Sequence, residues 1–143
     1  MTDAFTRPAA EGLPASGIVV ECARCWREAR DRRHPTQPRL FAKLVVHDCG
    51  ILAPVLDSLM ILCEAAIGRV LRTGNGPGRS QDERFLLDLL TTPEIVRNWT
   101  CAGKESAMAL GWALCSTNIM MRMTLGHSLL GSRPAKSGEC VNA

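Results

Sequence analysis

The sequence predicts a mainly α protein, a single-domain bundle of about four to five helices with one candidate for a short extended segment near the N-terminus. Two long segments, residues 40–72 and 104–125, carry apolar side chains around most of a helical circumference, which is typical of helices buried on more than one side. A length of 143 residues fits one domain with a sizeable core. We expect the helical domain to cover residues 17–130, between mobile segments at 1–16 and 131–143.

Composition and charge exclude wholesale disorder but leave the partner open. Apolar residues make up 46% of the chain, charged residues make up 22%, and the formal net charge is +3. The first residues lack both the apolar core of a secretion signal and the Arg-rich pattern of a transit peptide, so we expect a cytoplasmic protein. The longest run without formal charge, residues 106–121, is too short and too polar to cross a bilayer, so we expect no membrane partner.

The first half of the chain contains two helical segments. Residues 17–21, with the sequence GIVVE, are β-branched enough for a strand or an extended lead-in. The CARC sequence at 22–25 then begins a segment that favours helix until Pro35 and Pro38 stop it. The central helix follows the second proline.

The start of the central helix has two interpretations. Residues 39–46 are already helical in one of them, and in the other Asp48 is the N-cap of a fresh helix. In both cases Pro54 removes a backbone donor, which predicts a kink or a restart near residues 49–54. Three glycines and a proline within residues 73–78 then predict a loop.

The second half begins with a capping box, in which the Ser80 hydroxyl accepts from the Glu83 amide while the Glu83 side chain reaches back. A proline at the first helical position starts a short helix over residues 93–99. The last long helix covers Lys104 to Leu125 or Leu130.

The cysteines carry the sharpest local feature. They are seven, an odd number, and lie in apolar segments, which favours a reducing compartment. The spacing of Cys22 and Cys25 fits half of a zinc site. His47 and Cys49, or His34 with Cys49, could complete the tetrahedral nitrogen and sulfur set, although this second half is not a standard spacing. The same pair also fits a redox site at a helix start, or two ordinary thiols.

A basic cluster between Arg24 and Arg39 accompanies this thiol pair. Its members that could neutralise nucleic-acid phosphates are Arg24, Arg27, Arg30, Arg32 and Arg33. Trp26 lies among them and could stack on a base. The simpler interpretation is a solvated helix face, because the net charge is modest. A Zn-assisted nucleic-acid-binding regulator is therefore the alternative function.

Catalysis has little support in the sequence. No group of residues supplies a nucleophile, a base and an orienting residue together, so we expect a protein that is not an enzyme. Asp57 and Glu64 share the polar arc of the central helix and could form a carboxylate pair, but a solvated stripe explains them more simply.

The last long helix carries the principal functional hypothesis. Met108, Trp112, Cys115, Ile119 and Met123 share one of its faces, yet the other faces are also apolar. The remaining short helices are too few to cover both this helix and the central one. We therefore expect a second protomer to cover it, with Leu110, Trp112 and Met120 at the interface. The predicted function is that of a small soluble interaction or regulatory protein, homo-oligomeric, and we expect no cofactor other than the zinc considered above.

Overall fold

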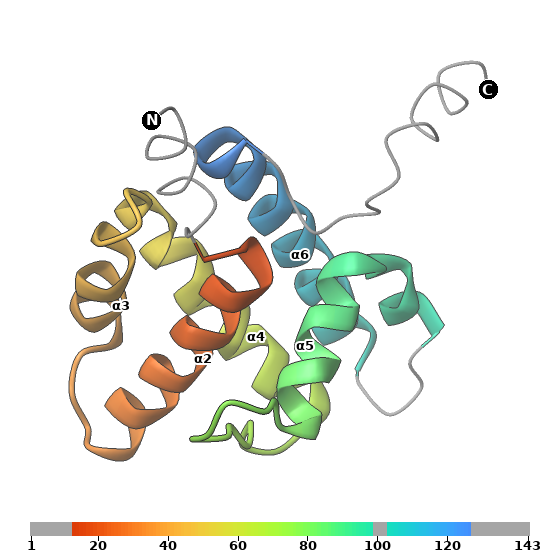
Figure 1. Ribbon diagram of the computed structural model, residues 1–143. Coiled ribbons are helices and arrows are strands. Elements are labelled where there is room, and N and C mark those ends of the chain that lie inside the picture. Colours follow the sequence, from red (N-terminus) through yellow and green to blue (C-terminus); the bar gives the residue numbers. More distant parts are fainter. Residues whose placement is uncertain (1–12, 99–102, 127–143) are drawn as a thin grey trace.

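The computed structural model describes residues 13–98 and 103–126, and it places five α-helices and two short 3-10 helices in these ranges (Figure 1). In chain order they are α2 (Ala15–Asp31), α3 (Thr36–Val45), η1 (Gly50–Leu52), α4 (Ala53–Ile67), α5 (Gln81–Thr91), η2 (Pro93–Asn98) and α6 (Lys104–Leu125). The described ranges contain no strand, and the predicted mainly α bundle is confirmed. The predicted mobile segments, 1–16 and 131–143, lie outside the described residues except for residues 13–16.

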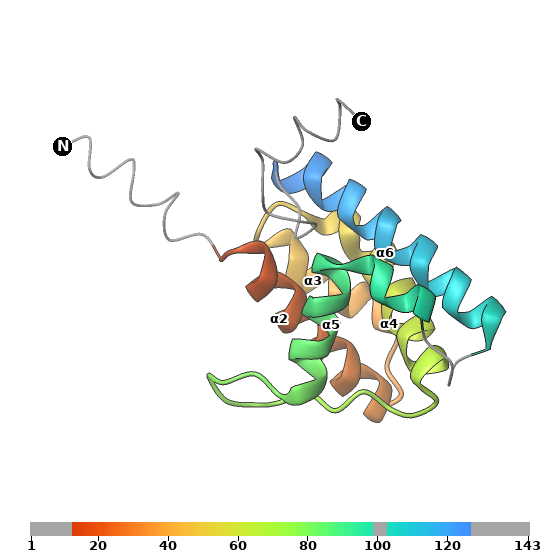
Figure 2. The ribbon, with the colours of Figure 1, turned by 90° about the vertical axis from the view of Figure 1, so that its right-hand side faces the viewer.

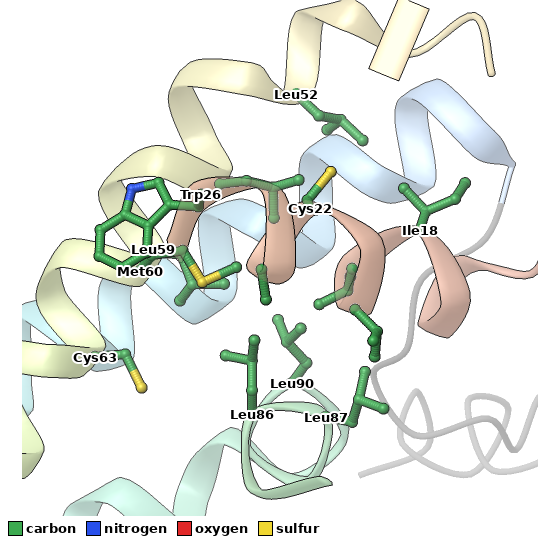
Figure 3. Packing of buried hydrophobic residues seen from close by; sticks show 14 of the residues in the cluster. Ile18, Cys22, Trp26, Leu52, Leu59, Met60, Cys63, Leu86, Leu87 and Leu90 are labelled. Carbon is green, nitrogen blue, oxygen red and sulfur yellow. The ribbon is translucent and has the colours of Figure 1, made fainter. Parts of the chain in front are cut away.

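Helix α4 forms the centre of the bundle. It runs antiparallel to α6 and also contacts α2 and α3, while α5 packs against α2 and α6 (Figures 1 and 2). The core between these helices is apolar: Trp26 of α2, Leu59 of α4 and Leu90 of α5 are all fully buried (Figure 3). Helix α4 is therefore covered on several sides by its own chain, as its apolar circumference predicts.

Helix α2 corrects the expectation of an extended segment at residues 17–21. The whole segment is helical, and Ile18, Val19, Cys22 and Trp26 are buried along one side of the helix. A β-branched run favours extended backbone only weakly, and burial of a helically spaced apolar face outweighs that preference.

The chain restarts between α3 and α4, as Pro54 predicts. Pro54 lies in the first turn of α4, where the missing backbone N–H would have had no helical partner. Asp48 is not the N-cap of this helix: its φ is +61°, and the residue preceding α4 is Leu52. The helix ends at Gly68, whose φ of +76° suits a residue without a side chain.

The capping box that begins α5 is confirmed in both directions. The Glu83 amide donates to the Ser80 hydroxyl over 3.1 Å, and the Ser80 amide donates to Glu83 Oε1 over 2.8 Å. The short helix expected at residues 93–99 is the 3-10 helix η2, and residue 99 lies outside the described ranges. Helix α6 begins at Lys104 as predicted and ends at Leu125, the earlier of the two ends that the sequence left open, with Gly126 at φ +85° after its last residue.

One described segment has the length and composition of a membrane span. It is Gly50–Ile67, with a mean hydropathy of 1.8 over 18 residues. A central helix packed against several others has the same composition, and 44% of this segment is buried inside the bundle.

Candidate interaction surface

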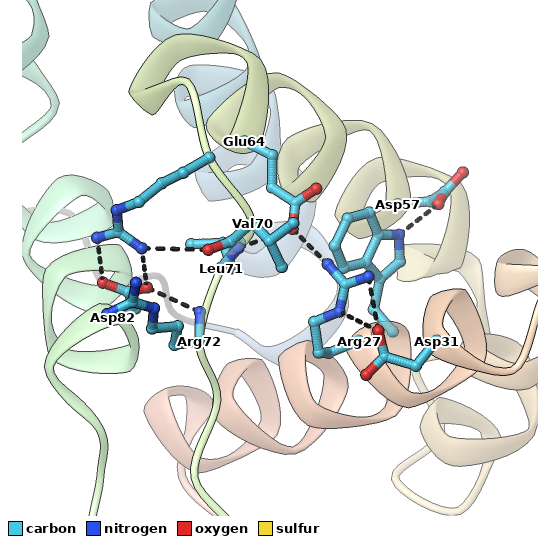
Figure 4. A network of polar contacts seen from close by, with 10 residues as sticks. Arg27, Asp31, Asp57, Glu64, Val70, Leu71, Arg72 and Asp82 are labelled. Atoms are coloured by element: carbon cyan, nitrogen blue, oxygen red, sulfur yellow. Dashed lines mark hydrogen bonds and ion pairs between the residues drawn. The ribbon is translucent and has the colours of Figure 1, made fainter.

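Helices α2 and α4 are joined by a polar seam. Asp57 of α4 accepts from the Trp26 indole N–H over 2.8 Å and from the Thr36 hydroxyl over 2.7 Å. Glu64, two turns further along α4, accepts from Arg27 over 2.6 Å (Figure 4). Asp57 is buried and Glu64 half-buried, so the expectation that they form a solvated stripe is wrong. Their hydrogen bonds fix α2 and α3 against α4.

A second polar seam joins α2 to α5 and to the loop before it. Glu83 accepts two hydrogen bonds from Arg24, over 2.7 and 2.9 Å, and one from the Gly74 amide over 2.8 Å. Burial alone would raise the pKa of Glu83, but the hydrogen bonds from Arg24 and the Ser80 and Gly74 amides outweigh it and lower the pKa to about 2. Glu83 therefore stays ionised and holds the loop in place.

These seams use part of the basic cluster considered for nucleic acid. Arg24 and Arg27 are the donors just described, and Arg32 pairs with Glu28 over 3.4 Å at the surface. Arg30 lies over the Trp26 ring, 5.1 Å from its centroid. Arg33 is exposed, with φ at +59°.

The position of Trp26, the aromatic residue of this cluster, also differs from the one that the nucleic-acid hypothesis requires. Trp26 is fully buried and its indole N–H is bonded to Asp57, so it has no face open for a base. Base stacking by Trp26 was therefore a wrong expectation. Of the arginines around it, Arg24 and Arg27 join α2 to other helices.

The four residues considered for zinc come from two places: Cys22 and Cys25 from α2, and His47 and Cys49 from the segment after α3. Cys22 and Cys49 are buried, and Cys25 and His47 are half-buried. Burial, together with the neighbouring thiols Cys25 and Cys49, raises the pKa of Cys22 well above its ordinary range. His47 Nε2 lies 3.2 Å from Glu21 Oε1 instead of facing these thiols.

No group of three or more His, Cys, Asp or Glu side chains in residues 13–98 and 103–126 is arranged to hold a metal ion. The zinc assignment stays a prediction without support from this arrangement. Thiols kept protonated by burial are also poor nucleophiles and poor metal ligands.

The inner face of α6 belongs to the core. Leu110, Leu114 and Met121 are fully buried, and the Asn118 amide donates to the Leu90 carbonyl of α5 over 3.0 Å. Leu110 was expected at an interface between protomers, and this placement is corrected: it packs inside its own chain. Met120 is half-buried against the same core.

The opposite side of α6 is apolar and exposed. We call it the α6 outer face, and it consists of Met108, Trp112, Cys115, Ile119 and Met123. Trp112 is 70% exposed and Met123 75% exposed, and Figure 2 shows α6 along one edge of the molecule. The five residues span about four helical turns, and an exposed apolar stripe of this length is a candidate interaction site.

A groove runs beside this face, between α4 and α6. Its volume is about 510 Å³, and its lining residues are Pro54, Val55, Ser58, Leu62, Ala109, Trp112, Ala113 and Ser116. The small side chains of Ala109 and Ala113 leave the space, and Trp112 is common to the groove and the α6 outer face. The face is therefore one ridge of a larger apolar surface.

The fold and this surface define a class: a small helical bundle that leaves one side of a long helix apolar and open. Comparison of the chain with protein-family models, curated proteins and solved structures found no match. The functional argument accordingly rests on the surface itself.

The sequence indicated the α6 outer face but not its exposure. The five residues share a face on a helical wheel, yet the inner face is equally apolar, so the weak amphipathicity does not say which side is buried. The small residues Gly111, half-buried, and Ser116, exposed, lie beside the stripe and interrupt the apolar circumference there, and they were the available signal.

Proposed function

We propose that this protein acts by association, as a small interaction or regulatory protein that forms a homodimer through the α6 outer face. The observation that carries this proposal is the exposure of Trp112, Ile119 and Met123 on a helix whose opposite side is fully buried. Covering such side chains removes apolar surface from water, which contributes a favourable free energy of about 25 cal/mol for each Å² buried.

The composition of the surface suits binding rather than bond chemistry. Its residues are apolar apart from the thiol of Cys115, and a large aromatic residue lies near its centre, as in the energetically important part of many interfaces. The polar groups of the bundle support the same view. No buried side-chain nitrogen or oxygen in the described part of the chain lacks a hydrogen-bond partner, so the polar interior is complete within one chain.

Light scattering over a wide range of protein concentrations tests the proposal. We expect the mass to rise from that of one chain to that of two, and Trp112→Glu to abolish the rise while circular dichroism keeps its helical signal. Val46→Glu is the matched control, because Val46 is similarly exposed, at 76%, but lies on the turn after α3. A wild-type protein that stays monomeric, or a Trp112→Glu variant that dimerises normally, would refute the proposal.

A further inference from the structure

We propose that the partner on the α6 outer face is a second copy of this chain in antiparallel orientation, with Glu105 of each protomer against the partner's Arg122. This inference rests on the proposed function and adds to it the direction and register of the two helices. It follows from the spacing of the exposed residues and from the charges at the two ends of the stripe.

The spacing along α6 is that of a helix pair. Met108, Trp112, Cys115 and Ile119 follow one another at intervals of four, three and four residues, the alternation that keeps one seam facing a partner helix. Continuing the same alternation in both directions reaches Glu105, three residues before Met108, and Arg122, three residues after Ile119. Both are exposed, so the seam begins with an acid and ends with a base.

These two charges cannot neutralise each other within one chain. They are 17 residues apart on α6, which corresponds to about 26 Å along the helix axis. Neither forms an ion pair with another described residue. Each is therefore available to a partner helix that crosses the stripe.

The charges select the direction. Two parallel helices in register would place Glu105 against the partner's Glu105 and Arg122 against the partner's Arg122, which is repulsive at both ends. In an antiparallel pair whose twofold axis passes between positions 113 and 114, Glu105 meets the partner's Arg122 at both ends. The self-complementary arrangement required by a twofold interface is then satisfied.

The same register matches the apolar layers between the charges. Met108 lies against the partner's Ile119, and Trp112 lies against the partner's Cys115, a sulfur–aromatic contact of a favourable kind. Lys104 reaches the partner's Met123, which its aliphatic stem can cover while the ammonium stays in water.

A shift of the register by one heptad is less favourable in either direction. In one direction Glu105 would lie against the partner's Cys115, which buries a carboxylate without a partner. In the other direction Arg122 would lie against the partner's Trp112, and Glu105 would be left beyond the described end of the partner helix. The arrangement with the axis between 113 and 114 is the one that uses every layer.

Charge reversal tests the register. We expect Glu105→Arg and Arg122→Glu each to raise the dimer dissociation constant by roughly tenfold at low salt, because like charges then meet at both ends. The double variant should restore the wild-type constant. Each reversal places a charge unfavourably for the helix dipole, so the double variant has the least stable helix of the three, and recovery cannot come from helix stability.

Directed disulfides give a second readout. In a Cys115→Ser background, the variant Met108→Cys with Ile119→Cys should form a dimer linked between 108 and 119 of the two protomers, identified by peptide mass spectrometry. Met108→Cys alone should not link, whereas a parallel pair would place two such cysteines face to face and link them.

The outcomes separate this inference from the proposed function. A wild-type dimer that Trp112→Glu dissociates, but whose constant is unchanged by the single reversals or is not restored by the double variant, would overturn the register and leave the association surface intact. A linked dimer from Met108→Cys alone would overturn the antiparallel direction. A monomeric wild-type protein, with the face covered by another part of the chain or left open, would overturn both.

Discussion

The seams around α2 and the outer face of α6 differ in how they complete their interactions. At the seams, each carboxylate accepts from a donor in a different part of the chain: Glu64 from Arg27 over 2.6 Å and Glu83 from Arg24 over 2.7 Å. Asp57 accepts from the neutral Trp26 indole N–H over 2.8 Å. On α6, the exposed groups are apolar and the two charges at the ends of the stripe have no described partner. Within its described residues the chain therefore satisfies its buried polar groups by itself, whereas one apolar side of α6 stays exposed, and this difference is the basis of the proposed association.

The two sides of α6 give the largest expected contrast. Leu110→Glu should prevent folding of the monomer, because it places a carboxylate without a partner in the core. Trp112→Glu, two residues further on and outward, should leave a folded monomer. Circular dichroism and thermal melting of both variants check this. A folded Leu110→Glu protein would show that the faces are assigned the wrong way round.

The seam at Asp57 gives the next effect. Asp57→Ala leaves the buried Trp26 indole N–H without its acceptor, and we expect a loss of about 1–3 kcal/mol in the free energy of unfolding. Leu59→Ala, its apolar neighbour in the core, should cost about 2–5 kcal/mol. Asp31→Ala, at an exposed carboxylate, is the control and should cost less than about 0.5 kcal/mol. Urea denaturation measures all three free energies. An Asp57→Ala protein as stable as the control would contradict the claim that the hydrogen bonds of Asp57 stabilise the fold.

The seam at Glu83 predicts a dependence on pH. Its pKa falls from an ordinary 4.5 to about 2 on folding, so the ionised group contributes stability above pH 4.5 that is lost as the pH falls toward 2. Melting temperatures measured over this range should fall with pH, and less steeply in Glu83→Gln, which does not titrate. The slope should not vanish, because Arg69 also lowers the pKa of Asp82. Equal slopes of melting temperature against pH in the two proteins would show that Glu83 does not contribute to the pH dependence.

The smallest effect on the monomer should come from the α6 outer face. Met123→Ser replaces a side chain that is 75% exposed, so we expect the free energy of unfolding of the monomer to change by less than about 0.5 kcal/mol. Denaturation of dilute protein checks this. A loss comparable to that of Leu59→Ala would mean that Met123 packs within its own chain.

Local sequence signals predicted the parts of the fold that depend on few residues. The Ser80 and Glu83 capping box, the restart at Pro54 and the start of α6 each follow from residues within one turn of the feature. The mainly α fold follows from the same helical periodicity over longer segments.

The features that the sequence did not reveal depend on distant residues. Asp57 was expected in water because nothing near it in the chain supplies a donor; the donors come from Trp26 and Thr36, 31 and 21 residues away. Leu110 was expected at an interface because the two sides of α6 are about equally apolar, and the elements that pack against α6, chiefly α4, η2 and α5, decide which side is buried. A single sequence shows the helical period of the apolar residues, but tertiary packing decides which side of the helix faces the core.

The reactivity of Cys115 tests most directly whether the α6 outer face is covered by association. Cys115 lies exposed in the middle of the stripe, whereas Cys25 is half-buried beside α3 and away from it. We expect a thiol reagent to modify Cys115 more slowly as the protein concentration rises, with the modified peptides quantified by mass spectrometry, while the rate at Cys25 stays constant. A rate at Cys115 that does not change while the mass of the protein doubles would show that the dimer forms elsewhere, and would contradict the account.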